Sequence, residues 1–215
     1  MKPVRILIAD DHDVVRQGVR AVIEGVDGWV VCGEASTGSA AVAQAVALRP
    51  DLCVLDIGMP ELNGLEATRR ILRLVPTSVL VLTMHDADQI IADVFAAGAS
   101  GCVLKSDSNR TLVQAIEAVL RRQPFVSAKV HEITQHGPPP VPRVDQNRRP
   151  DRLTARERQV LQLLTEGKGN KEVAALLGIS VKTAETHRAR VMAKLKLHSI
   201  GELVRYAVRN HIIQP

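Results

Sequence analysis

Five times between residues 4 and 122, a short apolar run rich in β-forming residues precedes a longer stretch with helical periodicity. The apolar runs are continuous rather than alternating, as in strands covered on both faces of a sheet. The longer stretches repeat apolar residues at i, i+3, i+4 and i+7, which gives a helix one apolar face. This order predicts parallel strands joined by crossover helices.

The expected elements can be read from these patterns. The predicted strands are Val4–Ala9, Val30–Ala35, Leu52–Asp56, Val79–Thr83 and Gly101–Leu104. The predicted helices are Val14–Val26, Ser39–Leu48, Leu65–Leu74, Gln89–Ala97 and Thr111–Arg121. We therefore expect an α/β domain with a five-stranded parallel sheet and helices on both faces.

The periodicity fades after Arg122, and a proline-rich segment follows from His136 to Pro142. Proline density favours a semi-extended spacer, so we predict a linker at 123–150 between domains at 4–122 and 151–215. A length of 215 residues fits two domains. The second domain has the pattern of a small all-α fold. Its four predicted helices are Ala155–Glu166, Lys171–Leu177, Val181–Leu195 and Ile200–Asn210. The last of them carries Ile200, Leu203, Val204 and Ala207 on one stripe, which favours packing in the core of this small domain.

Charge is divided unevenly along the chain. Residues 1–130 carry 13 basic and 15 acidic side chains, whereas residues 131–215 carry 15 and 8. The basic half indicates nucleic acid or another anionic partner, and a solvated basic face is the alternative. Because only four residues are aromatic, a platform that stacks single-stranded bases is excluded.

The cysteines and the apolar runs bear on the compartment. Cys32, Cys53 and Cys102 lie far apart without the spacing of a zinc site, which favours buried free thiols in a reducing environment. The chain begins directly with a predicted strand instead of a secretory signal, and its apolar runs are too short to span a bilayer. We therefore expect a cytoplasmic protein with no membrane partner.

Polar residues stand where the predicted strands end. Asp10 and Asp11 follow the first strand, Asp56 ends the third, Thr83 ends the fourth and Lys105 follows the fifth. Ligands of open parallel sheets bind beyond the carboxyl ends of the strands, so these side chains are expected to converge. A single Asp there is usually a helix cap, but clustered carboxylates repel unless a cation offsets them. Oxygen donors without His or Cys favour Mg²⁺.

A magnesium pocket that contains a lysine indicates phosphoryl chemistry. Asp56 is the candidate nucleophile that would accept a phosphoryl group, with Lys105 and the metal spreading the transition-state charge. Thr83 is a candidate hydrogen-bond donor to the new phosphoryl oxygens. A phosphatase of the haloacid dehalogenase kind would need a second Asp two residues after the nucleophile, where this chain has Gly58. We therefore predict a phosphoacceptor rather than an enzyme, with only slow self-catalysed phosphotransfer and dephosphorylation.

Residues 4–122 resemble the receiver domains of bacterial two-component response regulators. The shared motifs are Ala9-Asp10-Asp11-His12, Val54-Leu55-Asp56-Ile57-Gly58-Met59-Pro60, Asn63-Gly64, Leu82-Thr83-Met84 and Val103-Leu104-Lys105. The resemblance implies a flavodoxin-like fold in which a sensor histidine kinase phosphorylates Asp56. It also implies that Asp10, Asp11, Asp56 and the Gly58 carbonyl hold Mg²⁺, while Thr83 and Lys105 stabilise and signal the phosphorylated state.

One position departs from that pattern. Cys102 stands three residues before Lys105, where the family commonly has a Tyr or Phe that swings inward on activation. Because the thiol is too small to fill the space of a ring, either Thr83 acts alone or the switching surface is built differently.

The second half carries a helix-turn-helix pattern. Val173, Ala174, Leu177 and Ile179 form an inner face, and Gly178 falls at the turn. Ser180 is placed to cap the next helix. That helix directs Ala184, Val191 and Leu195 inward and Lys182, Glu185, Thr186, Ala189 and Arg190 outward.

Residues 153–213 resemble the LuxR-type DNA-binding domain. The shared motifs are Leu153–Arg158, Glu166–Lys168, Asn170–Ala174, Ser180–His187 and Lys194-Leu195. The resemblance implies that Val181–Leu195 enters the major groove of double-stranded DNA. The residues expected to contact DNA phosphates are Lys182, Arg188 and Arg190, and those expected to face bases are Glu185 and Thr186. Thr183 is expected beside them. His187 is expected to be a phosphate contact or a packing residue.

Together the two halves resemble the NarL/FixJ response regulators. The resemblance implies a transcription factor whose binding to promoter DNA is controlled by phosphorylation of Asp56. Its implied partners are a sensor kinase, promoter DNA, a second copy of the chain through the last helix, and RNA polymerase as a further candidate. The alternative is a regulator that binds DNA independently of phosphate.

Overall fold

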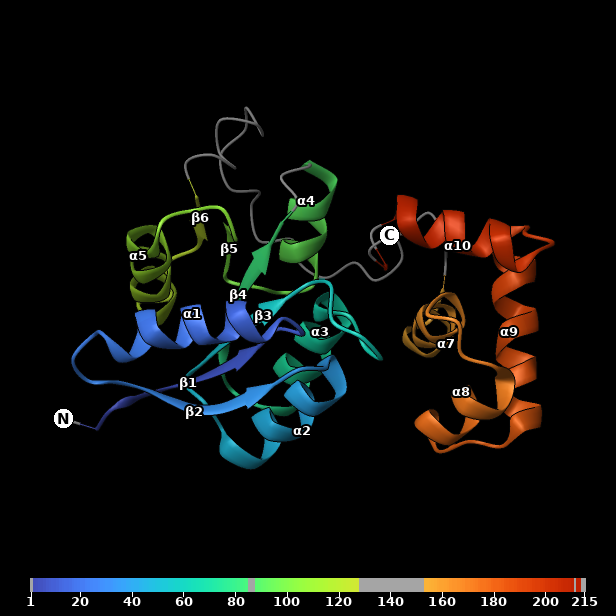
Figure 1. Cartoon of the computed structure of the whole chain (residues 1–215), viewed down its shortest axis with the longest axis horizontal. Helices are drawn as coiled ribbons and strands as arrows, with labels where there is room; N and C mark the ends of the chain where they lie inside the picture. The colour runs from blue at the N-terminus through green and yellow to red at the C-terminus, as the bar shows by residue number, and fades with distance from the viewer. Residues whose placement is uncertain (1, 85–87, 128–152, 211, 214–215) are drawn as a thin grey trace. The chain divides into compact units, whose positions relative to one another are not determined.

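The computed structural model describes residues 2–84, 88–127, 153–210 and 212–213, and the chain divides into two compact units (Figure 1). Most of the predicted linker, residues 128–150, lies outside the described residues. Among the described helices, none combines the length and the apolar character that a membrane span requires.

The first unit is built on a parallel sheet with the strand order β2-β1-β3-β4-β5-β6 (Figure 1). Its strands are β1 (Val4–Ala9), β2 (Trp29–Ala35), β3 (Leu52–Asp56), β4 (Ser78–Thr83), β5 (Gly101–Leu104) and β6 (Phe125–Val126). Every residue of β3 and β5 is buried, which explains why these strands are continuous apolar runs. The five predicted strands are confirmed to within one residue at each end.

Over the described residues the sheet has six strands, so the predicted number of five is wrong by one. β6 pairs with β5 through Gly101↔Phe125 and Cys102↔Val126. Two residues are too few to form a recognisable periodic pattern, and a preceding proline such as Pro124 is typical of a loop. The described part of the first unit therefore continues to Ser127, beyond the predicted start of the linker.

Helices cover both faces of this sheet. They are α1 (Asp13–Glu24), α2 (Gly38–Leu48), α3 (Gly64–Leu74), α4 (Asp88–Ala96) and α5 (Asn109–Leu120). α1 and α5 contact each other on one face, and α2 and α3 contact each other on the opposite face (Figure 1). Ile23 of α1 and Ile116 of α5 join Ile8 and Val54 of the sheet in one buried apolar cluster.

The second unit consists of α7 (Ala155–Thr165), α8 (Asn170–Leu177), α9 (Val181–Leu195) and α10 (Ile200–Arg209). α7 begins with a capping box, in which Thr154 and Glu157 satisfy each other's backbone donors. Gly178 ends α8 with φ +61, a conformation that glycine adopts without steric cost. Leu203 and Ala207 of α10 are buried as expected, but Ile200, which the sequence placed on the same inner stripe, is 46% exposed.

Candidate functional site

The carboxyl ends of β1, β3 and β5 bring two carboxylates and one ammonium group together. β1 and β3 are neighbours in the sheet, with Ala9 opposite Leu55, so Asp10 and Asp56 come from adjacent strand ends. Both residues are 1% exposed. The Lys105 Nζ atom lies 2.7 Å from Asp10 Oδ2 and 3.0 Å from Asp56 Oδ1. The structure thus joins three predicted site residues in one buried ion-pair cluster.

The charges in this cluster alter its protonation equilibria. Burial raises the pKa of Asp56, the Lys105 ammonium opposes that rise, and the Asp10 carboxylate adds to it. Burial alone would lower the pKa of Lys105, but its hydrogen bonds and charge interactions with Asp10 and Asp56 raise it overall. Because one ammonium faces two carboxylates, the cluster keeps negative charge that a further cation would offset.

Further potential metal ligands lie beside this cluster. Asp10, Asp11, His12 and Asp56 each offer a potential ligand atom, and these atoms lie within 4.8 Å of one another. The Gly58 N–H donates to Asp56 Oδ2 over 3.1 Å, which places this residue beside the same carboxylate. Three carboxylates fit a hard divalent cation such as Mg²⁺.

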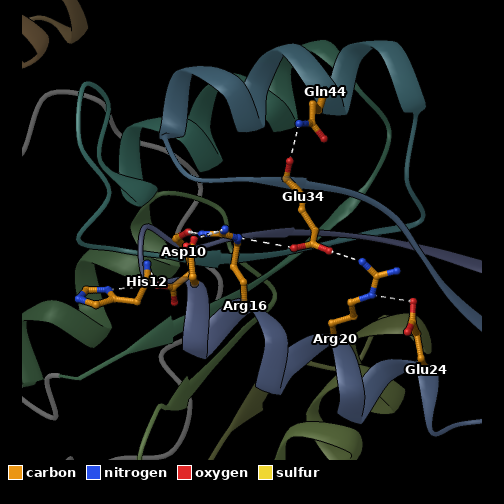
Figure 2. A network of polar contacts seen from close by, with 8 residues as sticks. Asp10, His12, Arg16, Arg20, Glu24, Glu34 and Gln44 are labelled. Carbon is orange, nitrogen blue, oxygen red and sulfur yellow. Dashed lines mark hydrogen bonds and ion pairs between the residues drawn. The ribbon is translucent and has the colours of Figure 1, made fainter.

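His12 is a member of the cluster that was not among the predicted metal ligands. Its Nδ1 atom lies 2.9 Å from Asp11 Oδ1 and 3.3 Å from Asp10 Oδ1, and its side chain is 57% exposed. Figure 2 shows the ring beside Asp10 at the start of α1. The signal was present in the Asp10-Asp11-His12 run, where adjacency in sequence places an imidazole next to two carboxylates.

The start of α3 packs against the backbone of Asp56. The Gly64 N–H donates to the Ile57 carbonyl over 2.9 Å, and the Asn63 side chain caps the helix by accepting from the Glu66 N–H. A Cβ atom at Gly64 would overlap the Asp56 carbonyl oxygen. The Asn63-Gly64 pair thus allows α3 to begin directly beside the candidate phosphoacceptor.

Thr83 and Cys102 occupy neighbouring strands. Thr83 is 1% exposed at the end of β4, and its carbonyl accepts a 2.8 Å hydrogen bond from the Lys105 N–H. Cys102 is fully buried between Val81 of β4 and Val126 of β6. Burial raises the pKa of its thiol to about 12, so the group stays protonated near neutral pH.

In the second unit, α9 exposes the predicted DNA-binding face. Ala184 and Val191 are buried, which turns the other side of the helix to solvent. The exposed residues are Lys182, Thr183, Glu185, Thr186, Arg188 and Arg190, whereas His187 is half-buried. The Ser180 hydroxyl accepts from the Thr183 N–H over 3.1 Å, so the predicted cap is present.

Two contacts fix α9 and the end of α8 to α7. The Lys194 Nζ atom of α9 lies 2.7 Å from Glu157 Oε2 of α7. The Arg156 Nη2 atom of α7 donates to the Leu177 carbonyl at the end of α8 over 2.6 Å. These contacts hold α9 against α7 and join α7 to the end of α8.

A parallel α/β unit with a buried carboxylate and lysine cluster, on a chain that also carries a basic helix-turn-helix, defines a receiver-type transcription regulator. Residues 6–117 match the family model for the response regulator receiver domain, and residues 151–207 match that for bacterial regulatory proteins of the luxR family. The chain belongs to the NarL/FixJ family of two-component response regulators, and it regulates transcription.

Individual relatives match over almost the whole chain. The transcriptional regulatory protein LiaR of Bacillus subtilis (strain 168) is 35% identical over 98% of this chain and 99% of its own length. The oxygen regulatory protein NreC of Staphylococcus epidermidis is 34% identical, with 98% and 99% covered. The solved structure of the Salmonella typhimurium response regulator RcsB has a TM-score of 0.59 at 27% identity, with 97% of this chain and 100% of that chain covered.

Proposed function

We propose that a sensor histidine kinase phosphorylates Asp56 and that this modification controls the binding of α9 to promoter DNA. The observation that carries the proposal is the buried cluster in which Lys105 contacts both Asp10 and Asp56. We assign the receiver to residues 4–122, the linker to 123–150 and the DNA-binding domain to 151–215. As a regulator of promoter DNA, the protein acts in the cytoplasm.

In the proposed reaction, an Asp56 carboxylate oxygen forms a bond to phosphorus while the bond to the donor, a phosphohistidine nitrogen, breaks. Lys105 stabilises the negative charge that develops on the transferring group. Asp10, Asp11, Asp56 and the Gly58 carbonyl would hold Mg²⁺, which supplies further charge neutralisation when bound. Because Gly58 offers no side chain as a general base, the acyl phosphate is hydrolysed slowly.

Thr83 reports the phosphorylated state to the rest of the receiver. Thr83 is buried at the same edge of the sheet, where its backbone carbonyl accepts a hydrogen bond from the Lys105 N–H. A hydrogen bond from its hydroxyl to the phosphoryl group would draw the end of β4 toward Asp56. Since Cys102 supplies no aromatic ring, Thr83 performs this step alone.

The exposed face of α9 contacts DNA in the major groove. Lys182, Arg188 and Arg190 bind backbone phosphates, while Glu185 and Thr186 face base edges. The Thr186 hydroxyl donates to the Lys182 carbonyl over 2.9 Å, which leaves its methyl group as the base-reading element, suited to a thymine methyl. A structure of the RcsB–DNA complex, 27% identical with a TM-score of 0.59, supports this proposal.

The active form is a homodimer that places two such helices on two half-sites and recruits RNA polymerase. Ile200, Val204 and Val208 lie at four-residue spacing on α10, so they share one face of that helix. Ile200 is 46% exposed, and the other two are half-buried. This partly exposed apolar stripe is the proposed dimer surface.

The proposal is tested by intact-mass spectrometry after incubation with acetyl phosphate and Mg²⁺. The wild type should gain one base-labile phosphoryl group, and Asp56→Asn should gain none because it lacks the nucleophilic oxygen. A wild type that remains folded but unmodified by both acetyl phosphate and phosphorylated kinases would contradict the proposal. If DNA binding by the wild type and Asp56→Asn were the same with and without the phosphodonor, the phosphate-independent regulator would be correct.

A further inference from the structure

A second polar network begins at Asp10 and runs along α1, away from the carboxylate cluster (Figure 2). Its centre is Arg16 in the first turns of α1, whose side chain is only 16% exposed. The Arg16 Nη1 atom donates to the backbone carbonyl of Asp10 over 2.8 Å, and its Nη2 atom contacts Asp13. The Nε atom lies 3.6 Å from Glu34 Oε2 on β2. One guanidinium therefore connects the end of β1, the start of α1 and β2.

The β2 end of this network is itself held in place. The Arg20 Nη1 atom lies 2.7 Å from Glu34 Oε1, and the Gln44 side chain of α2 donates to the Glu34 carbonyl over 2.5 Å. Beside this anchor, the Asp10 N–H donates to the Ala35 carbonyl over 3.1 Å. The peptide groups on both sides of the Asp10 Cα are thus fixed, one by β2 and the other by Arg16.

This fixation determines where the Asp10 side chain points. The Asp10 Oδ1 atom accepts from the His12 N–H over 2.9 Å, and Oδ2 faces Lys105. His12 is the N-cap residue of α1, and its side chain makes no capping hydrogen bond. The hydrogen bond from Arg16 to the Asp10 carbonyl instead ties the loop of Asp10 and Asp11 to the body of α1.

We propose that Arg16 is a positioning residue for magnesium binding, acting through the backbone of the loop that carries Asp10 and Asp11. This inference rests on the proposed function, in which these two carboxylates are metal ligands. The planar guanidinium of Arg16 donates hydrogen bonds to the Asp10 carbonyl and to Asp13, and its Nε side forms a longer ion pair with Glu34. A flexible ammonium group does not reproduce that arrangement.

A positioning role and a simple charge effect of Arg16 predict opposite changes in Mg²⁺ affinity when the residue is replaced. Removal of a cation beside an acidic pocket should strengthen Mg²⁺ binding if only electrostatics mattered, because less positive charge would repel the metal. Loss of positioning should weaken binding, because the ligand loop must then be ordered when the metal binds. The direction of change therefore separates the two roles.

The test is an Mg²⁺ titration of the full chain, followed by amide NMR shifts at Asp56 and Gly58. Arg16→Gln is expected to weaken Mg²⁺ binding about tenfold, equivalent to about 1.4 kcal/mol. Arg16→Lys, which keeps the charge but loses the fork, is expected to weaken it similarly. The matched control is Arg20→Gln, because Arg20 shares the Glu34 partner but contacts Glu24 instead of the Asp10 carbonyl. Its affinity for Mg²⁺ should equal that of the wild type.

Each alternative outcome has a defined meaning. Unchanged or tighter Mg²⁺ binding by Arg16→Gln would overturn the inference, and so would equal weakening in Arg20→Gln. Circular dichroism checks that the variants are folded; if Arg16→Gln is not, the charge-preserving Arg16→Lys decides, because it should still weaken Mg²⁺ binding although the charge near the pocket is unchanged. A wild type that binds no Mg²⁺ would refute the proposed metal site itself, and the inference with it.

Discussion

Gly64 illustrates how tightly single residues are constrained at the proposed phosphoacceptor site. A methyl group at this position would overlap the Asp56 carbonyl oxygen, so the backbone of α3 or of Asp56 must move to accommodate it. We expect Gly64→Ala to lower the free energy of unfolding by about 1–3 kcal/mol. It should also slow phosphorylation by acetyl phosphate, because the displaced backbone carries the nucleophile. Urea denaturation and timed mass spectrometry measure the two effects.

Gly18 provides the matched control for that substitution. It lies inside α1, and a Cβ atom there would meet no atom within 4 Å. Gly18→Ala should therefore raise stability by about 0.5–1 kcal/mol through lower unfolded-state entropy. Its phosphorylation rate should match the wild type. Similar destabilisation by both substitutions would show that the close approach at Gly64 is not the cause.

Glu157 links the capping box of α7 to α9. Burial alone would raise the pKa of its carboxyl, but Lys194 and the Thr154 backbone hold that pKa below its ordinary value of 4.5. A group whose pKa is lowered by folding stabilises the folded state above its unfolded pKa, and this contribution is lost as the pH falls through the folded pKa. The second unit should therefore lose stability below about pH 4.5.

Glu157→Gln removes that pH dependence along with the charge. At pH 7 it should lower the stability of the second unit by about 1 kcal/mol, because Gln still reaches the Thr154 N–H but no longer pairs with Lys194. Urea denaturation at pH 7 and at pH 3.5, followed by resolved amide signals of α7 and α9, measures the difference. A gap between wild type and variant that stays constant with pH would contradict the assigned role of this carboxylate.

At the level of whole elements, the proposed DNA contacts of α9 divide into those that set affinity and those that set specificity. Arg188→Ala should weaken binding to all DNA sequences and reduce the slope of log affinity against log salt by about one unit, because one phosphate contact is lost. Thr186→Ala should leave that slope unchanged and relax the preference at one base pair. Fluorescence anisotropy across a salt series measures both. An unchanged slope for Arg188→Ala would remove this residue from the phosphate contacts.

Elements with a strong periodic pattern were predictable from the sequence, and weak ones were not. β3 was placed at its observed ends because all of its residues are buried and the four before Asp56 are apolar. α9 was placed equally well because Ser180 caps it and Ala184 and Val191 mark its inner face. β6 escaped prediction because its two residues depend on pairing with β5, a contact that local sequence does not encode.

Some contacts of the candidate site were likewise predictable from the sequence, and others were not. Asp10, Asp56 and Lys105 were predictable because the ends of parallel strands meet at one edge of the sheet. The contact of Arg16 with Glu34 was not, because it depends on the rotation of α1 over β2. Ile200 was misplaced in the core because helical periodicity gives a face but does not specify how far the partner helix extends along it.

For the whole molecule, phosphorylation is expected to change the association state. Sedimentation velocity should show wild type shifting from monomer to dimer with acetyl phosphate and Mg²⁺, while Asp56→Asn stays monomeric. Ile200→Glu should accept phosphate but dimerise less, because it places a charge on the exposed stripe of α10. The control Leu74→Glu changes an apolar residue of the other unit that is even more exposed than Ile200, and it should still dimerise. Full dimerisation of Ile200→Glu would exclude α10 as the interface.

The strand order has a consequence for how such a site arises. The chain winds from β1 outward to β2, returns to β3 on the other side of β1, and then winds in the opposite direction to β6. In sheets of this kind the connections diverge where the winding reverses, which leaves room beyond the strand ends at that point. The path of the backbone thus determines where a ligand binds, and Asp10 and Asp56 determine which one. Descendants of the fold can therefore change their chemistry by substitution alone, without relocating the binding site.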